Sequence, residues 1–422
     1  GGAIAMIATV DRPPAQYALA ELVPNRVERV VSAEVAAACL DRATQKGEAV
    51  VPWGAGTKQS LGNFPARYDV ALDVSGLDSI IEYEPADLVV TAGAGITLAA
   101  LQRRLAGSGQ FLPLDPPYSQ TATLGGTLAT NASGPSRLLY GTARDMVLGL
   151  RVATPQGELV KSGGRVVKNV VGYDLNKLHI GALGTAGVMV EVTLKVQPLP
   201  AAEATVVASF GDLAGACLVA GRIAHSILYP RAVDIARNVS GAPEWRVLVW
   251  ASGSPATVER QVRDATDWCN EGGARSVDRL DGDAHRSLWR SVVEFGRASK
   301  GGALLKVTCL PNKLGALLMP ASDAGSMDAI TGVVARAGNG VAYLYSESAN
   351  VGAILSASAA ATALGGSAVL EEAPLNLKDG LDVWDPAGGA AGRRDDLPLM
   401  RAVKAQFDPE GTLNPGRYVG GI

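Results

Sequence analysis

A glycine-rich loop after an apolar strand is the first feature of this sequence that could carry chemistry. The segment VPWGAGTKQSLG, residues 51–62, runs from hydrophobic residues directly into Gly54-Ala55-Gly56-Thr57. Glycines adopt backbone conformations that other residues avoid, so such a loop can aim several consecutive N–H groups at an anion. A dinucleotide-binding fingerprint would need a helix directly after the glycines, but here more loop follows. The pattern indicates a phosphate-binding loop between two strands; the alternative is a tight turn without a ligand.

A second segment, TATLGGTLATNASGPSRLLYG at residues 121–141, places Gly125-Gly126 among small hydroxyl residues. Nothing bulkier than leucine occurs in its first half, and no charged residue occurs before Arg137. This composition suits a segment that presses its main chain against a flat ligand. The alternative is a flexible surface loop.

A third segment, residues 164–196, contains a few polar side chains among mostly apolar residues: Lys168, Tyr173, Asp174 and Lys177. Glycines follow at 181, 184 and 187, and a strand is expected from Val188. The alternative for this segment is a glycine-rich connection between a helix and a strand.

The elements that must position these segments alternate between strands and helices in the first half. The pattern predicts helices over 33–46, with Ser32 as N-cap, and from Thr97 to about Gly107. Residues 112–149 show little periodicity, apart from a strand that begins at 148. The expected strands are 27–31, 49–53, 70–74, 80–84, 88–92, 148–154, 157–161 and 188–196.

Pro198-Leu199-Pro200 marks a boundary, after which strands and helices again alternate. The rhythm predicts a second α+β domain, with an antiparallel sheet and helices on one face. For Trp245, Trp250, Trp268 and Trp289 of this domain, core packing is favoured over a ligand cage. The predicted strands are 204–210, 246–251, 303–309, 340–346 and 367–371, and the predicted helices are 213–225, 255–272, 323–337, 353–364 and 399–407.

Composition narrows the class of protein. The chain has 422 residues, of which 47% are hydrophobic and 19% charged, so it folds into two or three domains rather than remaining disordered. The net charge of −3 argues against a protein that coats nucleic acid. No stretch reaches the roughly 18 to 20 apolar residues that a membrane span needs.

Cysteines and histidines are few and scattered. The four cysteines form no CxxC, so an iron–sulfur cluster, a zinc site or a disulfide framework built by this chain alone is not predicted. His179, His225 and His285 are too far apart for a histidine-pair motif, and no metal is expected. These features, without a recognisable signal peptide, predict a cytoplasmic protein.

Taken together, the motifs resemble a known family. PWGAGT, ATLGGTLATNASG, RDMVLGLRVATPQGE, KNVVGYDLNKL, GTAGV and the closing FDPEGTLNPGR resemble the vanillyl-alcohol-oxidase and p-cresol-methylhydroxylase superfamily of FAD-binding proteins. The resemblance covers most of residues 27–200 and the last ~25 residues. It is nearest to the D-2-hydroxyacid dehydrogenase branch, and within that branch to the FAD-binding subunits of bacterial glycolate oxidase.

The resemblance implies an α+β fold in which a two-subdomain FAD-binding domain of the p-cresol-methylhydroxylase type carries an α+β cap domain. The FAD-binding domain is expected over 27–198, with subdomains of about 27–92 and 93–198. The cap, a substrate or partner domain, is expected over 199–395. Residues 396–422 return to the FAD-binding domain.

The resemblance also implies which residues bind FAD. The first loop binds the pyrophosphate through backbone amides, the Gly125-Gly126 segment lies along the flavin and pyrophosphate, and the GTAGV segment meets the adenosine. No histidine occurs before His179, so FAD is expected to be noncovalent. The expected cofactor-binding residues are Pro52, Trp53, Gly54, Ala55, Gly56, Thr57, Lys58, Pro116, Thr123, Leu124, Gly125, Gly126, Ala129, Thr130, Ser133, Gly184, Gly187, Val188 and Asn414.

Catalytic residues are not identified, because the chain departs from the family there. No histidine follows His285, and the usual Gly-Ser-Glu-Gly-Thr is here 181–185, Gly-Ala-Leu-Gly-Thr. Taking a proton from a hydroxyl while a hydride leaves for the flavin needs a positioned base. The remaining candidates for contact with an anionic group are Tyr173, Lys168 and Arg144.

The resulting hypothesis is an FAD-binding oxidoreductase subunit that supports or relays electron transfer from glycolate oxidation. Its expected partners are a catalytic flavoprotein subunit and an iron–sulfur subunit, with a small 2-hydroxy acid such as glycolate as substrate of the complex and no nucleic acid. The complex would be cytoplasmic or peripheral to the inner membrane. Two alternatives stay open: a self-sufficient FAD-dependent hydroxyacid dehydrogenase, and a non-catalytic assembly subunit with a degenerate FAD site.

Overall fold

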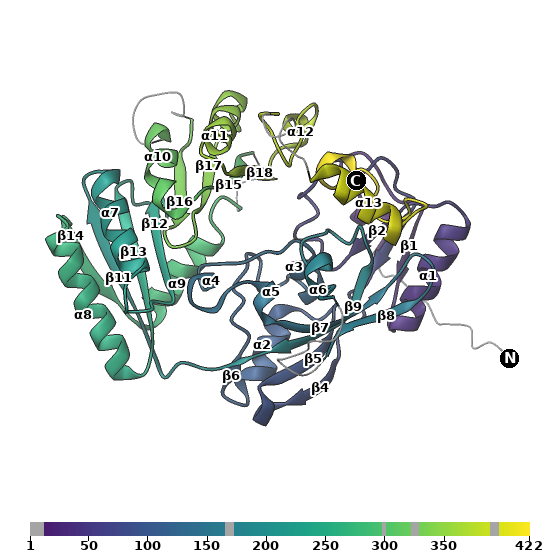
Figure 1. Ribbon diagram of the computed structural model, residues 1–422, viewed down its shortest axis with the longest axis horizontal. Coiled ribbons are helices and arrows are strands. Elements are labelled where there is room, and N and C mark those ends of the chain that lie inside the picture. Colours follow the sequence, from purple (N-terminus) through teal and green to yellow (C-terminus); the bar gives the residue numbers. More distant parts are fainter. Residues whose placement is uncertain (1–11, 165–172, 298–300, 322–328, 389–395) are drawn as a thin grey trace. The chain divides into compact units, whose positions relative to one another are not determined.

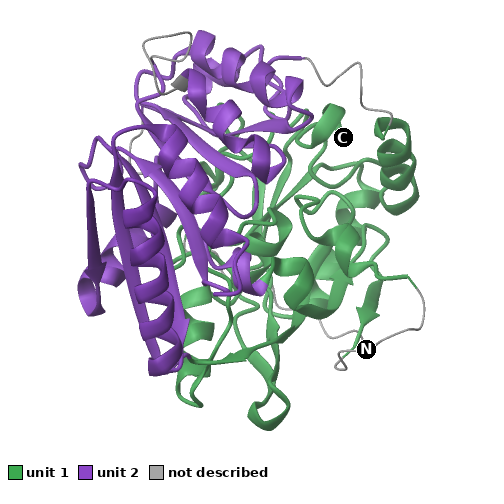
Figure 2. Ribbon diagram, turned by 60° about the vertical axis from the view of Figure 1, so that its left-hand side comes forward, with its two compact units in different colours: residues 1–133, 141–199, 395–422 green, residues 134–140, 200–394 purple. Residues whose placement is uncertain are grey.

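A computed structural model describes residues 12–164, 173–297, 301–321, 329–388 and 396–422 (Figure 1). The chain divides into two compact units (Figure 2). Unit 1 comprises residues 1–133, 141–199 and 395–422, and unit 2 comprises residues 134–140 and 200–394. The chain therefore leaves unit 1 after Leu199 and returns to it at the C-terminus. The divisions expected from the sequence were after residues 198 and 395, and the sequence did not indicate that residues 134–140 belong to unit 2.

Unit 1 begins with a small parallel sheet. Its strands are β1 (Arg26–Arg29), β2 (Val50–Trp53) and β3 (Val70–Asp73), in the order β1-β3-β2. Helix α1 (Ala33–Gln45) begins where Ser32 Oγ accepts a hydrogen bond from Val35 N at 3.2 Å. Its buried face packs against both this sheet and residues of the second sheet of the unit.

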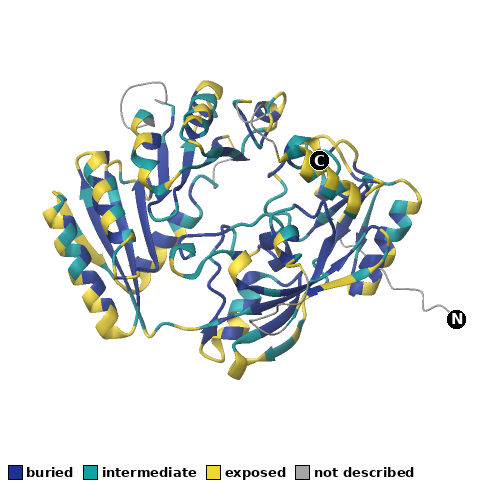
Figure 3. Cartoon of the chain, viewed as in Figure 1, coloured by how far each residue is buried: buried dark blue, intermediate teal, exposed yellow. Residues whose placement is uncertain are grey.

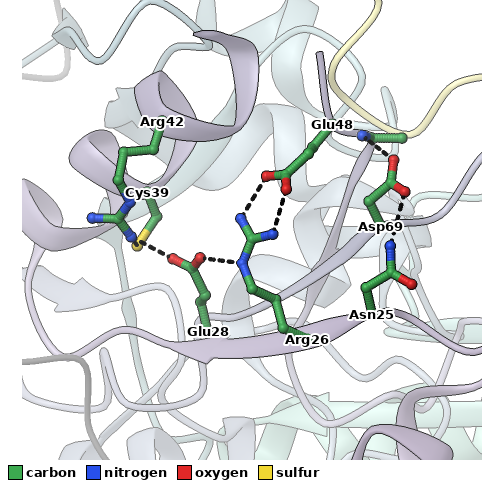
Figure 4. A network of polar contacts seen from close by, with 8 residues as sticks. Asn25, Arg26, Glu28, Cys39, Arg42, Glu48 and Asp69 are labelled. Carbon is green, nitrogen blue, oxygen red and sulfur yellow. Dashed lines mark hydrogen bonds and ion pairs between the residues drawn. The ribbon is translucent and has the colours of Figure 1, made fainter. Parts of the chain in front are cut away.

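An ion-pair network ties β1 to α1 and to the turn before β2 (Figure 4). Arg26 donates to both oxygens of Glu48 at 2.6 Å and to Glu28 at 2.7 Å, while Arg42 donates to the other oxygen of Glu28. Burial by itself would raise the pKa of Glu28, but hydrogen bonds with Cys39 and Arg26 and the charge of Arg42 hold it below its usual value. Burial and the nearby Glu28 raise the pKa of Cys39 to about 12, so this thiol is inert.

The second sheet of unit 1 is antiparallel, in the order β4-β5-β9-β7-β8. It corrects the expected subdomain division at residue 92. β5 pairs with β9 along its whole length and β4 pairs with β5, so both strands belong with residues after 93. The chain passes between the sheets after Asp73. The strands are β4 (Ile80–Glu84), β5 (Val89–Gly93), β7 (Val147–Ala153), β8 (Leu159–Gly163) and β9 (Val188–Lys195).

Short elements fill the rest of unit 1. Thr97 caps α2 (Leu98–Ala106) by accepting from Ala100 N at 3.2 Å, as expected. The stretch 112–149, which shows little periodicity, contains helices of only four to six residues, too short to produce a periodic signal. The remaining elements of unit 1 are β6 (Gln110–Phe111), α3 (Leu124–Ala129), α5 (Ala143–Met146), α6 (Asn176–His179), β10 (Gln197–Pro198) and α13 (Leu397–Phe407).

Unit 2 is built on one eight-stranded antiparallel sheet, in the order β14-β11-β13-β12-β16-β17-β15-β18. Residues 134–140, with α4 (Arg137–Tyr140), belong to this unit; Arg231 donates to Ser136 Oγ at 2.7 Å. The strands are β11 (Ala202–Phe210), β12 (Ala232–Arg237), β13 (Trp245–Gly253), β14 (Ser276–Leu280), β15 (Ala303–Thr308), β16 (Gly332–Arg336), β17 (Val341–Ser346) and β18 (Ser367–Glu372).

Helices cover both faces of this sheet, which corrects the expectation of one covered face. Helices α7, α8, α10, α11 and α12 pack with one set of strand residues, and α9 packs its Leu288, Trp289 and Val292 against the other set. Most strands of unit 2 are accordingly buried along their length (Figure 3), whereas the edge strand β14 is largely exposed. The helices are α7 (Leu213–Ala224), α8 (Pro255–Glu271), α9 (Gly282–Val293), α10 (Leu314–Leu318), α11 (Val351–Ala363) and α12 (Leu375–Lys378).

The predicted helix over 323–337 is wrong where the structure describes it. Residues 332–336 form β16, which pairs with both β12 and β17 and is buried throughout; residues 322–328 lie outside the described residues. A short apolar run does not distinguish a buried strand from a buried helix. Sequence patterns also did not indicate β12, β14 and α9.

Trp245, Trp250 and Trp289 are buried in the two hydrophobic clusters of unit 2. Trp268 is partly buried and packs against the cluster that contains Trp245. The expectation of core packing is confirmed for these four tryptophans. Among the helices that the structure describes, none is long and apolar enough to span a membrane.

Candidate cofactor-binding site

The loop after β2 begins a cleft in unit 1. β2 ends at Trp53, whose carbonyl accepts from Val74 N at 2.8 Å. The backbone N–H groups of Ala55, Gly56 and Thr57 donate to no acceptor among the described residues. Three successive amides without a protein partner are a suitable arrangement for binding an anionic oxygen.

Close contacts explain why two positions of this loop are glycine. A Cβ added at Gly54 would lie 2.1 Å from Thr123 Oγ1, which is far inside contact distance. Gly56 has a φ of +76°, and a Cβ there would lie 2.7 Å from the ring of Trp53. The glycines thus let the loop pass directly over neighbouring side chains.

A buried chain of hydrogen bonds fixes the Trp53 ring beneath the loop. Trp53 Nε1 donates to Tyr68 Oη at 2.7 Å, and Tyr68 Oη donates to the carbonyl of Tyr17 at 2.8 Å. Tyr17 Oη in turn donates to Asp73 Oδ2 at 2.6 Å, and burial, with the bond to Asp73, raises the pKa of Tyr17. The Tyr17 and Trp53 rings meet edge to face at 5.0 Å.

The second glycine segment crosses the cleft as the start of α3. Thr123 is its N-cap, and Thr123 Oγ1 accepts from Gly126 N at 3.3 Å. Gly125 N donates to Ala94 O at 2.7 Å, and a Cβ at Gly125 would lie 2.9 Å from the Ala94 Cβ. The expected close approach of main chain thus occurs here, just after β5.

The third segment turns back beside α3 before β9 begins. Leu183 N donates to Ala129 O at 2.9 Å, and Leu183 itself has a φ of +50°. Gly184 has a φ of +73°, and a Cβ there would lie 3.2 Å from Pro52. The segment therefore lies directly against β2, next to the first loop.

The C-terminal segment completes the cleft from the far end of the sequence. Asn414 N donates to Val50 O at 2.9 Å, and Asn414 Nδ2 donates to Leu183 O at 2.5 Å. Asn414 is 2% exposed, and its Oδ1 has no hydrogen-bond partner among the described residues. It is an available acceptor at the wall of the cleft.

Lys404 and Asp408 hold this segment in place. Asp408 accepts from Thr412 N at 2.9 Å and from Leu413 N at 2.7 Å, and it pairs with Lys404 at 2.5 Å. Lys404 Nζ also donates to the carbonyls of Thr185 and Leu413, both at 2.8 Å. Burial lowers the pKa of Lys404, and Asp408 offsets part of that effect. One ion pair thus connects α13, the third segment and the closing motif.

The cleft has an empty volume of about 710 Å³, part of which is open to solvent. Of the expected cofactor-binding residues, the structure brings the following to its lining: Pro52, Trp53, Gly54, Ala55, Gly56, Thr57, Lys58, Thr123, Gly125, Gly126, Ala129, Thr130, Gly184, Gly187, Val188 and Asn414.

Three expected residues do not line this cleft: Pro116, Leu124 and Ser133. Leu124 is fully buried in the interior of unit 1. Sequence reasoning missed six lining residues: Gln59, Leu61, Val74, Leu183, Met189 and Arg417. Gln59 lies just after the PWGAGT motif and Arg417 ends the FDPEGTLNPGR motif. No pattern in the neighbouring sequence indicates that these two side chains are in contact.

The charge of the cleft is positive. Lys58 and Arg417 line it, and no acidic residue occurs among the described residues of its lining. Burial lowers the pKa of Arg417 to about 10, which still leaves its guanidinium charged at neutral pH. An anionic group is therefore favoured here over a cation.

Of the catalytic candidates, the two that the structure describes, Tyr173 and Arg144, do not line the cleft. Tyr173 is 94% exposed, and Lys168 lies outside the described residues. Arg144 is exposed and donates to Ile180 O at 3.1 Å. It lines a separate groove beside α13.

The histidines offer no base at the cleft either. His179 is 6% exposed, and burial lowers its pKa to about 4. His225 lies in unit 2, and His285 is buried there with its Nδ1 2.7 Å from Thr205 Oγ1. The described residues contain no group of three or more His, Cys, Asp or Glu that could hold a metal ion.

The cleft fits a ligand with adjacent phosphates and flat ring systems. Ala55, Gly56 and Thr57 supply amides that donate to no acceptor among the described residues, and Asn414 supplies an acceptor. At Gly54 and Gly125 the main chain packs so closely on its neighbours that a side chain would not fit. FAD has this chemistry, so the residues present fit the group that the sequence resemblance implies.

Comparisons with known proteins agree with this fit. Residues 24–163 match the FAD binding domain, and residues 390–418 match the C-terminal domain of FAD linked oxidases. The chain is 26% identical to glycolate oxidase subunit GlcD of Bacillus subtilis (strain 168) over 396 residues, covering 87% of this chain and 83% of that protein. It is 44% identical to glycolate oxidase subunit GlcE of Escherichia coli (strain K12) over 133 residues, covering 31% of this chain and 38% of that protein.

The fold is shared with a solved structure of alkyldihydroxyacetonephosphate synthase. The TM-score is 0.69 at 17% identity, and the match covers 92% of this chain and 76% of that one. The predicted α+β fold with an FAD-binding domain and an antiparallel sheet in unit 2 is confirmed, and so is FAD as the cofactor.

Proposed function

Because this chain is an FAD-linked oxidoreductase homologous to the glycolate oxidase subunits, we propose that it is the FAD-binding subunit of a glycolate-oxidase-like complex. Its role is to support or relay electron transfer from the oxidation of glycolate or a similar small 2-hydroxy acid. Its partners are a catalytic flavoprotein subunit and an iron–sulfur subunit.

One observation carries the choice of a subunit over a self-sufficient enzyme. The cleft provides what FAD binding requires, but its described lining contains no His, Asp or Glu that could act as a base. Oxidising a hydroxy acid requires removal of the hydroxyl proton as well as the hydride. A chain that binds the flavin without such a base fits a role in electron transfer beside a catalytic partner.

At residue level, the amides of Ala55, Gly56 and Thr57 bind the pyrophosphate of FAD, with Lys58 adding positive charge. The α3 start at Gly125-Gly126 gives the ring system a flat wall, and the turn at Gly184 and Gly187 borders the adenosine. Bound FAD supplies a ring system that accepts and donates electrons. The cofactor is held noncovalently, since no histidine stands in or before the first loop.

The test is the visible absorption spectrum of the purified full chain, recorded before and after anaerobic glycolate. We expect flavin bands that glycolate alone does not bleach, and bleaching when the catalytic flavoprotein and iron–sulfur subunits are added. Acid precipitation should release the flavin into the supernatant, as a noncovalent cofactor requires.

Two outcomes contradict the proposal. Bleaching by glycolate with this chain alone would make it a self-sufficient hydroxyacid dehydrogenase with a base outside the described lining. A colourless protein that FAD cannot reconstitute would make it an assembly subunit with a degenerate site.

A further inference from the structure

Arg417 lies at the end of the closing motif and is 4% exposed, although arginine is rarely buried. It lines the same cleft as the first glycine loop. Its backbone is fixed there, because Asn63 N donates to Arg417 O at 3.0 Å and Ala66 N donates to Pro415 O at 2.8 Å. The side chain therefore enters the loop region from a segment that is anchored independently.

The guanidinium binds the far end of the loop. Arg417 Nη1 donates to Gln59 Oε1 at 2.6 Å, and Nη2 donates to the carbonyls of Gln59 and Leu61, both at 2.7 Å. Gln59 Nε2 then donates to Pro52 O at 2.9 Å, at the end of β2. Arg417 and Gln59 thus connect the two ends of the loop whose middle carries the unpartnered amides.

These three acceptors are neutral oxygens. A buried charge is less costly when an opposite charge lies nearby. A diphosphate on the neighbouring amides would add negative charge close to the guanidinium, while the fork shape of the guanidinium keeps the loop carbonyls turned toward it.

We infer that Arg417 is a positioning residue for the FAD pyrophosphate: it holds the Gly54–Lys58 loop in its binding shape and adds a buried positive charge to the site. The inference concerns cofactor binding by this chain and does not depend on whether the chain acts as a subunit.

The experiment measures FAD affinity of the full-length apoprotein at several salt concentrations. The variants are Arg417→Gln, which removes the charge, and Arg417→Lys, which keeps the charge but loses the fork. The matched control is Arg401→Gln, an exposed arginine on α13 that donates to Gly420 O at 3.3 Å. Apoprotein unfolding temperatures are recorded for all variants, so that loss of fold is separated from loss of affinity.

We expect Arg417→Gln to weaken FAD binding by about tenfold to a hundredfold, the range for loss of a charge-assisted contact. Its affinity should also depend less on salt than that of the unmodified chain. ADP, which shares the diphosphate, should lose affinity in parallel. Arg417→Lys should retain the salt dependence with an intermediate affinity, and Arg401→Gln should bind FAD within about twofold of the original chain.

Two results would overturn the inference. One is a folded Arg417→Gln protein whose FAD affinity changes no more than that of Arg401→Gln. The other is an equal loss of affinity in Arg417→Gln and Arg417→Lys with an unchanged salt dependence, which would leave Arg417 a purely structural role. Should Arg417→Gln fail to fold, Arg417→Lys decides between these cases, because only the positioning role predicts retained salt dependence with weakened binding.

Discussion

Replacing Asp408 by asparagine should destabilise unit 1 and loosen its cofactor. The Asp408 carboxylate accepts two backbone N–H bonds, from Thr412 and Leu413, and pairs with the largely buried Lys404. Asparagine keeps the shape, but its amide group places a donor opposite one of these donors. It also leaves the Lys404 ammonium without its charged partner.

The expected loss is about 3 kcal/mol, at the lower end of the cost of breaking a buried ion pair. The control is Asp174→Asn, because Asp174 forms an exposed pair with Lys177 at 3.2 Å, with side chains 49% and 59% exposed. Exposed pairs of this kind contribute about 0 to 1 kcal/mol, so the control should shift stability by less than about 0.5 kcal/mol.

Urea unfolding at a fixed FAD concentration, followed by the flavin fluorescence that rises when FAD is released, reports on unit 1. We expect a lower midpoint at unchanged slope for Asp408→Asn, together with faster loss of FAD on dialysis. If Asp408→Asn shifts the midpoint no further than Asp174→Asn, the ion pair does not anchor the closing motif and the reasoning fails.

Two further predictions concern the cleft and its surroundings. Gly54→Ala should displace the Thr123 hydroxyl from its capping position, because the new Cβ would lie 2.1 Å from Thr123 Oγ1. We expect the lost cap to destabilise the fold by about 1 kcal/mol and FAD binding to weaken. The control Gly221→Ala has nothing within 4 Å of its new Cβ and should be neutral or slightly stabilising in the same assays. The pKa of His179 is about 4 in the folded chain and about 6.5 in the unfolded chain. Because the folded chain holds His179 in its neutral form, the folded state is favoured fully above pH 6.5. This stabilisation is lost as the pH falls toward 4, because the unfolded chain takes up a proton there. The pKa difference corresponds to about 3 kcal/mol, and unfolding of His179→Phe between pH 4 and 8 should lack this part of the pH dependence; identical pH profiles would contradict it.

Local sequence patterns were sufficient for much of unit 1. The helix at α1 follows from Ser32 and its apolar spacing, and the loop at Gly54–Thr57 follows from its glycines after an apolar strand. The glycine segments also pointed to close contacts of main chain, because only glycine tolerates what the structure shows at 54 and 125. These features depend on a few consecutive residues, and therefore a sequence displays them directly.

Local sequence patterns could not predict the features that depend on strand pairing. β16 reads as part of a helix because a short apolar run carries no period of its own, and pairing on both sides decides its conformation. β4 and β5 join the second sheet through the pairing of β5 with β9, about a hundred residues away, so the expected subdomain boundary was misplaced.

Motifs in the chain were enough to predict the cofactor class, and the quoted motifs contain most residues that line the cleft. Three-dimensional packing was needed to bring Arg417 onto Gln59, residues 358 positions apart, and to align Asn414 with Leu183 across 231 positions. The physical reason is that most of unit 2 is inserted in the sequence between the parts of unit 1. Contacts across such an insertion depend on how the sheets and the closing segment pack, and no spacing within the chain encodes that packing.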